Sequence, residues 1–131
     1  MLLAASNPGW QVTAIDFNPA HIAEARDWAA AAGLSNVRFL EADLTTLAED
    51  PIARDIPEAD FVTMHGLWTW VSPAVQKGVV RLLRDKVRPG GLVYVSYNSL
   101  PGWGPRMGIQ RIAYEAGRRL AIRSDRQAEE G

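Results

Sequence analysis

The sequence contains no cysteine, and this absence limits the chemistry available to the chain. Without thiols there is no disulfide bond, no thiolate zinc site and no cysteine nucleophile. The 131 residues carry a formal net charge of −1, so no overall field attracts nucleic acid or an anionic membrane. No apolar stretch is long enough to span a bilayer. We therefore expect one globular domain, in a reducing compartment such as the cytoplasm, without nucleic acid or membrane as partners.

The first residues of the chain are predicted to belong to a helix. Residues 1–6 are mostly apolar, but they lack the basic start of a secretory signal. The following Asn7-Pro8-Gly9 stops a helix, because a proline disfavours helical backbone at the residue before it. Residues 1–6 therefore represent the last turn or two of a helix whose beginning is lacking.

Apolar strands and amphipathic helices alternate along the rest of the chain. Short apolar segments rich in β-branched residues predict strands at 11–16, 37–43, 60–66 and 92–97. Asn18-Pro19 and Ser72-Pro73 each supply an N-cap followed by a first-turn proline, and the two helices that they begin extend to Gly33 and Val87. Residues 44–56 form a loop or a short helix. The alternation predicts an α/β fold with a parallel sheet and right-handed crossovers.

A last amphipathic helix is predicted at 105–126. Its apolar side is expected to face the core through Ile109, Ile112, Ala113, Ala116 and Leu120.

Polar and aromatic residues follow the predicted strands at their carboxyl ends, where open α/β sheets bind ligands. They are Asp16, Asp43, His65 with Gly66, and Tyr97 with Asn98. Asp16 can accept hydrogen bonds from both hydroxyls of a ribose, as acids do at this place in nucleotide-binding folds. Asp43 can accept the exocyclic amine of an adenine, and the N–H of Leu44 can meet a ring nitrogen. The alternatives are that Asp16 caps the helix that follows and that Asp43 is a solvated turn residue.

Four segments resemble, in order and with suitable spacing, the successive motifs of class I S-adenosylmethionine-dependent methyltransferases. They are Asp16-Phe17-Asn18-Pro19, residues 31–37, Glu41-Ala42-Asp43 and Arg88-Pro89-Gly90-Gly91. The resemblance covers residues 1 to about 103, and implies a single, partial methyltransferase domain with a Rossmann-like sheet. It implies that Asp16 holds the ribose of S-adenosylmethionine and that Phe17 packs near the adenine. It also implies that Asp43 and Leu44 contact the adenine.

Residues 65–72 and 96–103 resemble a narrower group, the bacterial methyltransferases with a C-terminal methyltransferase regulatory domain. This group includes protein-lysine methyltransferases, so the resemblance implies a protein lysine as one possible methyl acceptor beside small molecules. Candidate catalytic residues are His65, Tyr97 and Asn98, and His65 is also a candidate contact of the cofactor. Candidate substrate-binding residues are Trp68, Trp70 and Trp103, which can attract an alkylammonium group by cation–π interaction. A hydrogen-bonded strand-end histidine and tryptophans that cover the core are the alternatives.

The family pattern also includes a strand and a Gly-x-Gly loop that hold the methionine end of the cofactor. No such segment precedes Leu3, and Gly9 is misplaced for this role. In the family this strand lies between those predicted at 12–16 and 61–66. We expect a truncated chain, without the last strands and any regulatory domain, in which the two flanking strands have unpaired backbone groups unless they move together.

Two other functions stay open from the sequence. An NAD-dependent oxidoreductase would use Asp16 in the same way, but it leaves Asp43 and the Pro89-Gly90-Gly91 turn unexplained. A chain without the methionine-binding loop is also consistent with an inactive fragment or degenerate copy.

Overall fold

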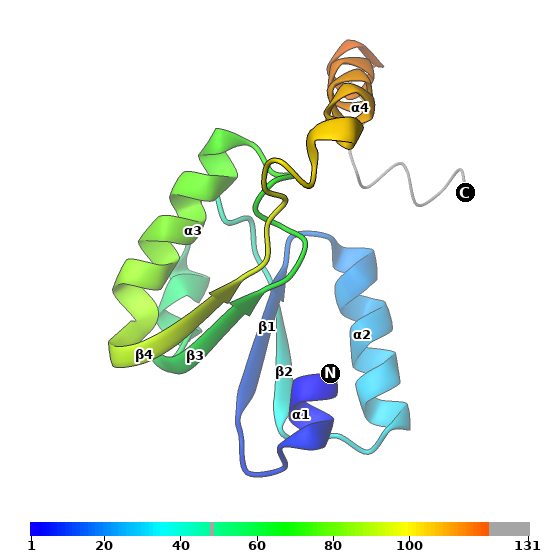
Figure 1. The fold of residues 1–131 in the computed structure, drawn as a ribbon. Coiled ribbons are helices and arrows are strands. Elements are labelled where there is room, and N and C mark those ends of the chain that lie inside the picture. The colour runs from blue at the N-terminus through cyan, green and yellow to red at the C-terminus, as the bar shows by residue number, and fades with distance from the viewer. Residues whose placement is uncertain (48, 121–131) are drawn as a thin grey trace.

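The structure is a computed structural model that describes residues 1–47 and 49–120, with side chains described as far as residue 116. Its helices and strands alternate as predicted (Figure 1). In chain order they are α1 (Leu2–Ser6), β1 (Val12–Asp16), α2 (Pro19–Ala31), β2 (Val37–Glu41), the 3-10 helix η1 (Pro51–Asp55), β3 (Ala59–Met64), α3 (Pro73–Lys86), β4 (Val87–Val95), the 3-10 helix η2 (Gly104–Arg106) and α4 (Met107–Leu120).

The strands form two separate parallel pairs rather than one sheet. β1 pairs with β2 in the register Val12↔Val37 to Asp16↔Glu41, and β3 pairs with β4. In Figure 1 α2 and α3 lie on opposite sides of the strands, and the carboxyl ends of the strands point the same way. Among the described residues β1 and β3 share no ladder, so the predicted gap between them is confirmed and the two strands have not closed it.

The two long helices begin where the sequence predicted. Asn18 precedes α2, and its side-chain oxygen accepts a hydrogen bond from the N–H of Ala20 at 2.9 Å. Ser72 precedes α3 and accepts from the N–H of Val75 at 3.4 Å. In each case a proline holds the first helical position, where a missing N–H costs nothing. Gly33 follows α2 with a φ of 65°, a conformation that glycine adopts without strain.

The Arg88-Pro89-Gly90-Gly91 turn lies inside a strand rather than before it. β4 already pairs with β3 at Ala59↔Val87, and the regular register resumes at Phe61↔Leu92. The extra residues form an irregularity in the ladder, in which Gly90 has a φ of 84°. The strand thus extends over Val87–Val95 instead of the predicted 92–97.

An apolar cluster of buried residues lies between the β1–β2 pair, η1 and α3. Ala42, Leu47 and Ile56 are its centre, and partly buried side chains surround them: Ile15, Leu40, Leu44, Ile52, Ala53 and Leu82. Because it includes residues that directly follow β2, this cluster fixes the polypeptide at the tip of that strand.

The prediction for the last helix was wrong in its packing. α4 projects away from the strands (Figure 1), and the side chains of Ile109 and Ile112 are each 71% exposed. Ala113 and Ala116 are exposed as well. The amphipathic pattern requires a cover for the apolar face, but it cannot specify which surface provides it. The side chain of Leu120 and the predicted extension over 121–126 lie outside the described residues.

Within residues 1–47 and 49–120, the helices are all too short or too polar to traverse a bilayer.

Candidate functional site

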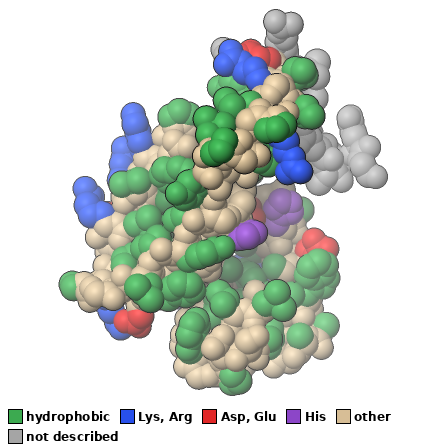
Figure 2. Space-filling view, viewed as in Figure 1, with side chains coloured by type: hydrophobic (Ala, Val, Ile, Leu, Met, Phe, Trp, Pro, Cys, Tyr) green, Lys and Arg blue, Asp and Glu red, His purple; other side chains and the backbone are tan. Residues whose placement is uncertain are grey.

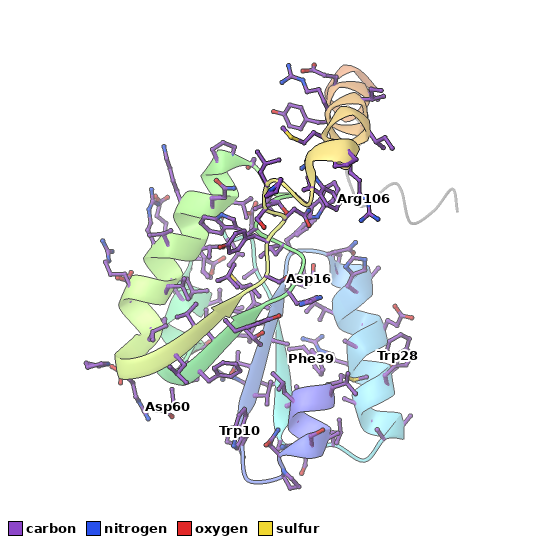
Figure 3. All side chains as sticks on the ribbon, viewed as in Figure 1. Trp10, Asp16, Trp28, Phe39, Asp60 and Arg106 are labelled. Atoms are coloured by element: carbon purple, nitrogen blue, oxygen red, sulfur yellow. The ribbon has the colours of Figure 1, made fainter. Side chains whose placement is uncertain are left out.

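The tip of β1 carries a small network of polar side chains. One oxygen of Asp16, Oδ1, accepts a hydrogen bond from the backbone N–H of Asn18 at 2.9 Å. The other oxygen, Oδ2, lies 3.3 Å from Nδ1 of His21, on the first turn of α2. Asn18 is only 2% exposed, whereas the Asp16 side chain is 39% exposed. The network therefore orients a carboxylate that remains partly exposed to solvent. Figure 3 labels Asp16 among the surrounding side chains.

The tip of β2 places the second predicted acid nearby. The N–H of Ala42 donates to the carbonyl of Asp16, so the two strand ends lie side by side. Oδ1 of Asp43 accepts from the N–H and from the hydroxyl of Thr45, both at 2.8 Å. Asp43 thus caps the turn that follows β2, and it is exposed at the same rim as Asp16.

The neighbours of these acids differ in exposure. Phe17 is 52% exposed, so its ring is available for contact with a planar base. Leu44 is half-buried and packs against the apolar cluster. A methyl group added at Gly78 of α3 would lie 1.8 Å from the Leu44 carbonyl oxygen, so α3 holds this segment by a close backbone contact.

His65 directly follows β3 and is exposed. Its ring lies parallel to that of Tyr94, with the centroids 6.4 Å apart. Next to it, the N–H of Gly66 donates to the Ser96 hydroxyl at 2.7 Å, which ties the tip of β3 to the tip of β4. Figure 2 shows histidine side chains beside a hollow near the middle of the visible face.

The predicted tryptophans are divided between two environments. Trp70 is 55% exposed and meets Trp103 edge to face, with the ring centroids 5.9 Å apart. The Arg106 guanidinium lies 5.3 Å from the centre of the Trp103 ring, so this ring already receives a cation. Trp68 is half-buried, and its carbonyl accepts from the Gln76 side chain at 2.9 Å.

Asn98 contacts another loop of the protein. Its amide nitrogen donates to the Thr69 hydroxyl at 3.1 Å. The side chain of Gln110, on α4, donates to the Thr69 carbonyl at 3.2 Å and accepts from the Trp103 indole at 2.9 Å. Thr69 therefore joins the loops after β3 and β4 to the start of α4. Tyr97, by contrast, is 64% exposed.

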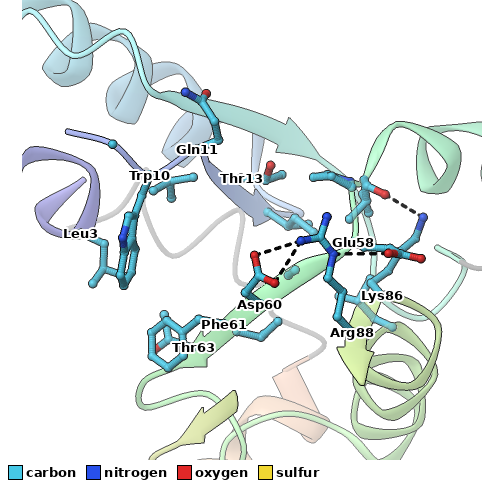
Figure 4. A pocket seen from close by; sticks show the side chains of 18 residues that line it. Leu3, Trp10, Gln11, Thr13, Glu58, Asp60, Phe61, Thr63, Lys86 and Arg88 are labelled. Carbon is cyan, nitrogen blue, oxygen red and sulfur yellow. Dashed lines mark hydrogen bonds and ion pairs between the residues drawn. The ribbon is translucent and has the colours of Figure 1, made fainter. Parts of the chain in front are cut away.

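A large cavity lies elsewhere, in the gap between β1 and β3 (Figure 4). Its volume is about 690 Å³, and none of the predicted site residues lines it. At one end Arg88 donates to both oxygens of Asp60, at 3.0 and 3.2 Å, and this hydrogen bonding raises the pKa of Arg88. Residues of both strands line the rest, and Trp10 meets Phe61 edge to face. The cavity thus lies along the edges of β1 and β3 that share no ladder within the described residues.

Two features of the site were not predicted from the sequence. His21 received no role from the sequence, although it follows Asp16 by only five residues and its Nδ1 lies 3.3 Å from Oδ2 of that acid. The Thr69–Gln110 contact joins residues 41 positions apart, and no local pattern reveals it. Among the described residues, no group of three acidic or histidine side chains could hold a metal ion.

Comparison with known proteins places this arrangement in a family. The model of the family described as "Methyltransferase domain" matches residues 1–91. An uncharacterized protein from Synechocystis is 41% identical over 117 residues, which are 89% of this chain and 22% of that protein. A second, from Rickettsia prowazekii, is 28% identical over 83% of this chain and 42% of its own length. The chain thus spans less than half of these relatives.

Solved structures show the same fold. PKMT2 from Rickettsia typhi superposes with a TM-score of 0.70 at 26% identity, over 83% of this chain and 20% of that one. The same protein in complex with AdoHcy gives a TM-score of 0.70 at 24% identity, over 93% and 22%. Because the family match covers more than half of the residues and includes Asp16, Asp43 and the Pro89-Gly90-Gly91 turn, it decides against the oxidoreductase alternative. The chain belongs to the methyltransferase domain family.

Proposed function

We propose that the protein containing this chain transfers the methyl group of S-adenosylmethionine to an amine, and that the acceptor is a protein lysine. The observation that carries the proposal is the accessible, oriented carboxylate of Asp16 at the tip of β1, within the region matched by the methyltransferase domain. The complex of PKMT2 with AdoHcy supports the choice of cofactor, because AdoHcy remains when S-adenosylmethionine has lost its methyl group.

The residues at the tips of β1 and β2 fit the adenosyl part of this cofactor. Asp16 retains acceptor sites on both oxygens for the two ribose hydroxyls. Asp43 and the N–H of Leu44 are proposed to meet the edge of the adenine, and the exposed Phe17 its face. These assignments divide the nucleoside between two adjacent strand ends.

The loops after β3 and β4 are proposed to hold the acceptor. Methyl transfer from a sulfonium is an in-line displacement in which the leaving thioether needs no proton, so the protein contributes mainly by orienting the reactants, which is worth roughly 7–11 kcal/mol. Trp70 is proposed to offer an aromatic face to an alkylammonium group, and Trp103 the face that the Arg106 guanidinium does not cover. Trp68 is proposed to shape the same loop from its half-buried position.

Three residues are proposed to act on the attacking amine or close to it. A neutral His65 next to the cofactor takes the proton that the amine must lose. The side-chain carbonyl of Asn98 accepts a hydrogen bond from the amine, since the amide nitrogen is used by Thr69. The Tyr97 hydroxyl is exposed at the same tip and provides a further contact.

The test uses the natural gene product that contains this chain. Calorimetry measures its affinity for S-adenosylhomocysteine, with NAD as the control ligand, and methyl-labelled cofactor with lysine-containing peptides measures transfer. We expect binding of S-adenosylhomocysteine but not of NAD, and label on lysine. No binding would refute the cofactor assignment, and label on another residue or on a small molecule would refute the acceptor.

A further inference from the structure

We propose that His21 is a positioning residue that fixes the Asp16 carboxylate for the two ribose hydroxyls of the cofactor. The proposal rests on the proposed function, and it adds a residue to that site. It follows from the hydrogen bonds that determine which ring nitrogen of His21 carries the proton.

The amide of Asn18 has only one possible orientation. The N–H of Ala20 is a donor, so the Asn18 atom 2.9 Å away must be the amide oxygen. The amide nitrogen therefore points in the other direction, and it lies 3.3 Å from Nε2 of His21. Because Asn18 is 2% exposed, its neighbours restrict this orientation further.

The orientation of Asn18 determines the tautomer of His21. An amide nitrogen only donates, so Nε2 of a neutral His21 must accept and its proton must be on Nδ1. Nδ1 lies 3.3 Å from Oδ2 of Asp16, so this proton is donated to the carboxylate. A buried asparagine thus directs an exposed histidine toward the acid at the tip of β1.

The two carboxylate oxygens are thereby each held by one donor. Oδ1 of Asp16 accepts from the Asn18 N–H, and Oδ2 accepts from His21. A carboxylate has about four acceptor sites, so one or more remain on each oxygen. Two oxygens in a fixed plane, each with a free acceptor site, match a vicinal diol better than a freely rotating carboxylate does.

The test separates this role from a general structural one. In the natural gene product, His21→Leu removes the donor, and His21→Asn keeps an N–H close to the position of Nδ1. We expect the affinity for S-adenosylhomocysteine to fall about fivefold to tenfold in His21→Leu and to stay within about twofold in His21→Asn. Glu24→Gln, at an exposed position of the same helix, is the matched control with unchanged affinity.

A second ligand identifies the group that His21 serves. For the 2′,3′-dideoxy analogue of S-adenosylhomocysteine, we expect wild type and His21→Leu to bind equally. An equal loss with both ligands, or no loss with either, would overturn the positioning role.

NMR of the ligand-free protein tests the tautomer directly. With ¹⁵N-labelled histidine at mildly alkaline pH, we expect the ring proton of His21 on Nδ1, and a proton on Nε2 would overturn the proposal. This spectrum is informative even if S-adenosylhomocysteine does not bind, a result that would refute the proposed function by itself.

Discussion

The tips of β1 and β4 are built in different ways. At β1, the contacts of Asp16 with Asn18 and His21 span two and five residues of sequence. At β4, Asn98 contacts a residue 29 positions away, and the same Thr69 receives Gln110 from 41 positions away. A site made of local contacts can be formed by one strand and the start of one helix, whereas the other requires two loops and α4 to meet.

This difference corresponds to the two ligands proposed for the site. The locally built tip is assigned to the cofactor, whose nucleoside is the same in every reaction of the family. The tip assembled from distant loops is assigned to the acceptor, which differs between methyltransferases. Substitutions at each tip, and at the contact between α3 and the segment that follows β2, test whether the two tips are independent.

The largest effect is expected at the contact between α3 and the segment that follows β2. Gly78→Ala places a methyl group 1.8 Å from the Leu44 carbonyl oxygen, and a backbone atom cannot yield as a side chain would. We expect the free energy of unfolding to fall by about 3 kcal/mol, measured by chemical denaturation. Lys77→Ala, at the exposed neighbouring position, should be nearly neutral. Equal free energies of unfolding for the two variants would contradict a close contact between Gly78 and the Leu44 backbone.

The next effect concerns the cofactor tip alone. Asp16→Asn keeps the size of the side chain but removes the charge, so we expect affinity for S-adenosylhomocysteine to fall about tenfold to a hundredfold. Glu41→Gln, directly across the ladder from Asp16, is the control and should bind as wild type. If both variants lost affinity alike, calorimetry would point to general electrostatics rather than a contact with ribose.

The caps of α2 and α3 allow a comparison of how much each contributes to the free energy of unfolding. Asn18 is buried and makes a cap hydrogen bond of 2.9 Å, whereas the Ser72 cap is longer, at 3.4 Å, and more exposed. Asn18→Ala should therefore lower the free energy of unfolding by about 2 kcal/mol and Ser72→Ala by about 0.5 kcal/mol. The reverse order in denaturation experiments would contradict the view that the β1 tip is the more firmly built.

A small effect is expected at the acceptor tip. Trp70→Leu removes one cation–π partner, worth about 0.5–1 kcal/mol at an exposed position, so the KM for a lysine peptide should rise about threefold. The affinity for S-adenosylhomocysteine should not change. Trp28→Leu, at an exposed position of α2, is the control and should leave both quantities unchanged. A loss of cofactor affinity in Trp70→Leu would show that the two tips are coupled.

The contrast between the tips also explains what the sequence could predict. Strand and helix positions follow from local patterns, and the caps at Asn18 and Ser72 were correct because capping involves neighbouring residues. The direction of α4 was wrong, because Ile109 and Ile112 form an apolar face whatever surface covers it. The contacts of Thr69 with Asn98 and Gln110 depend on where two loops and α4 meet, and residue spacing does not encode that.

The central claim is that Asp16 binds the ribose of an adenosyl group. Its most direct test is an experimental structure of the natural gene product with S-adenosylhomocysteine. We predict both ribose hydroxyls within about 3 Å of the Asp16 oxygens, with the adenine beside Asp43 and Phe17. A nucleoside bound away from the tip of β1, with Asp16 still paired only to Asn18 and His21, would contradict the claim.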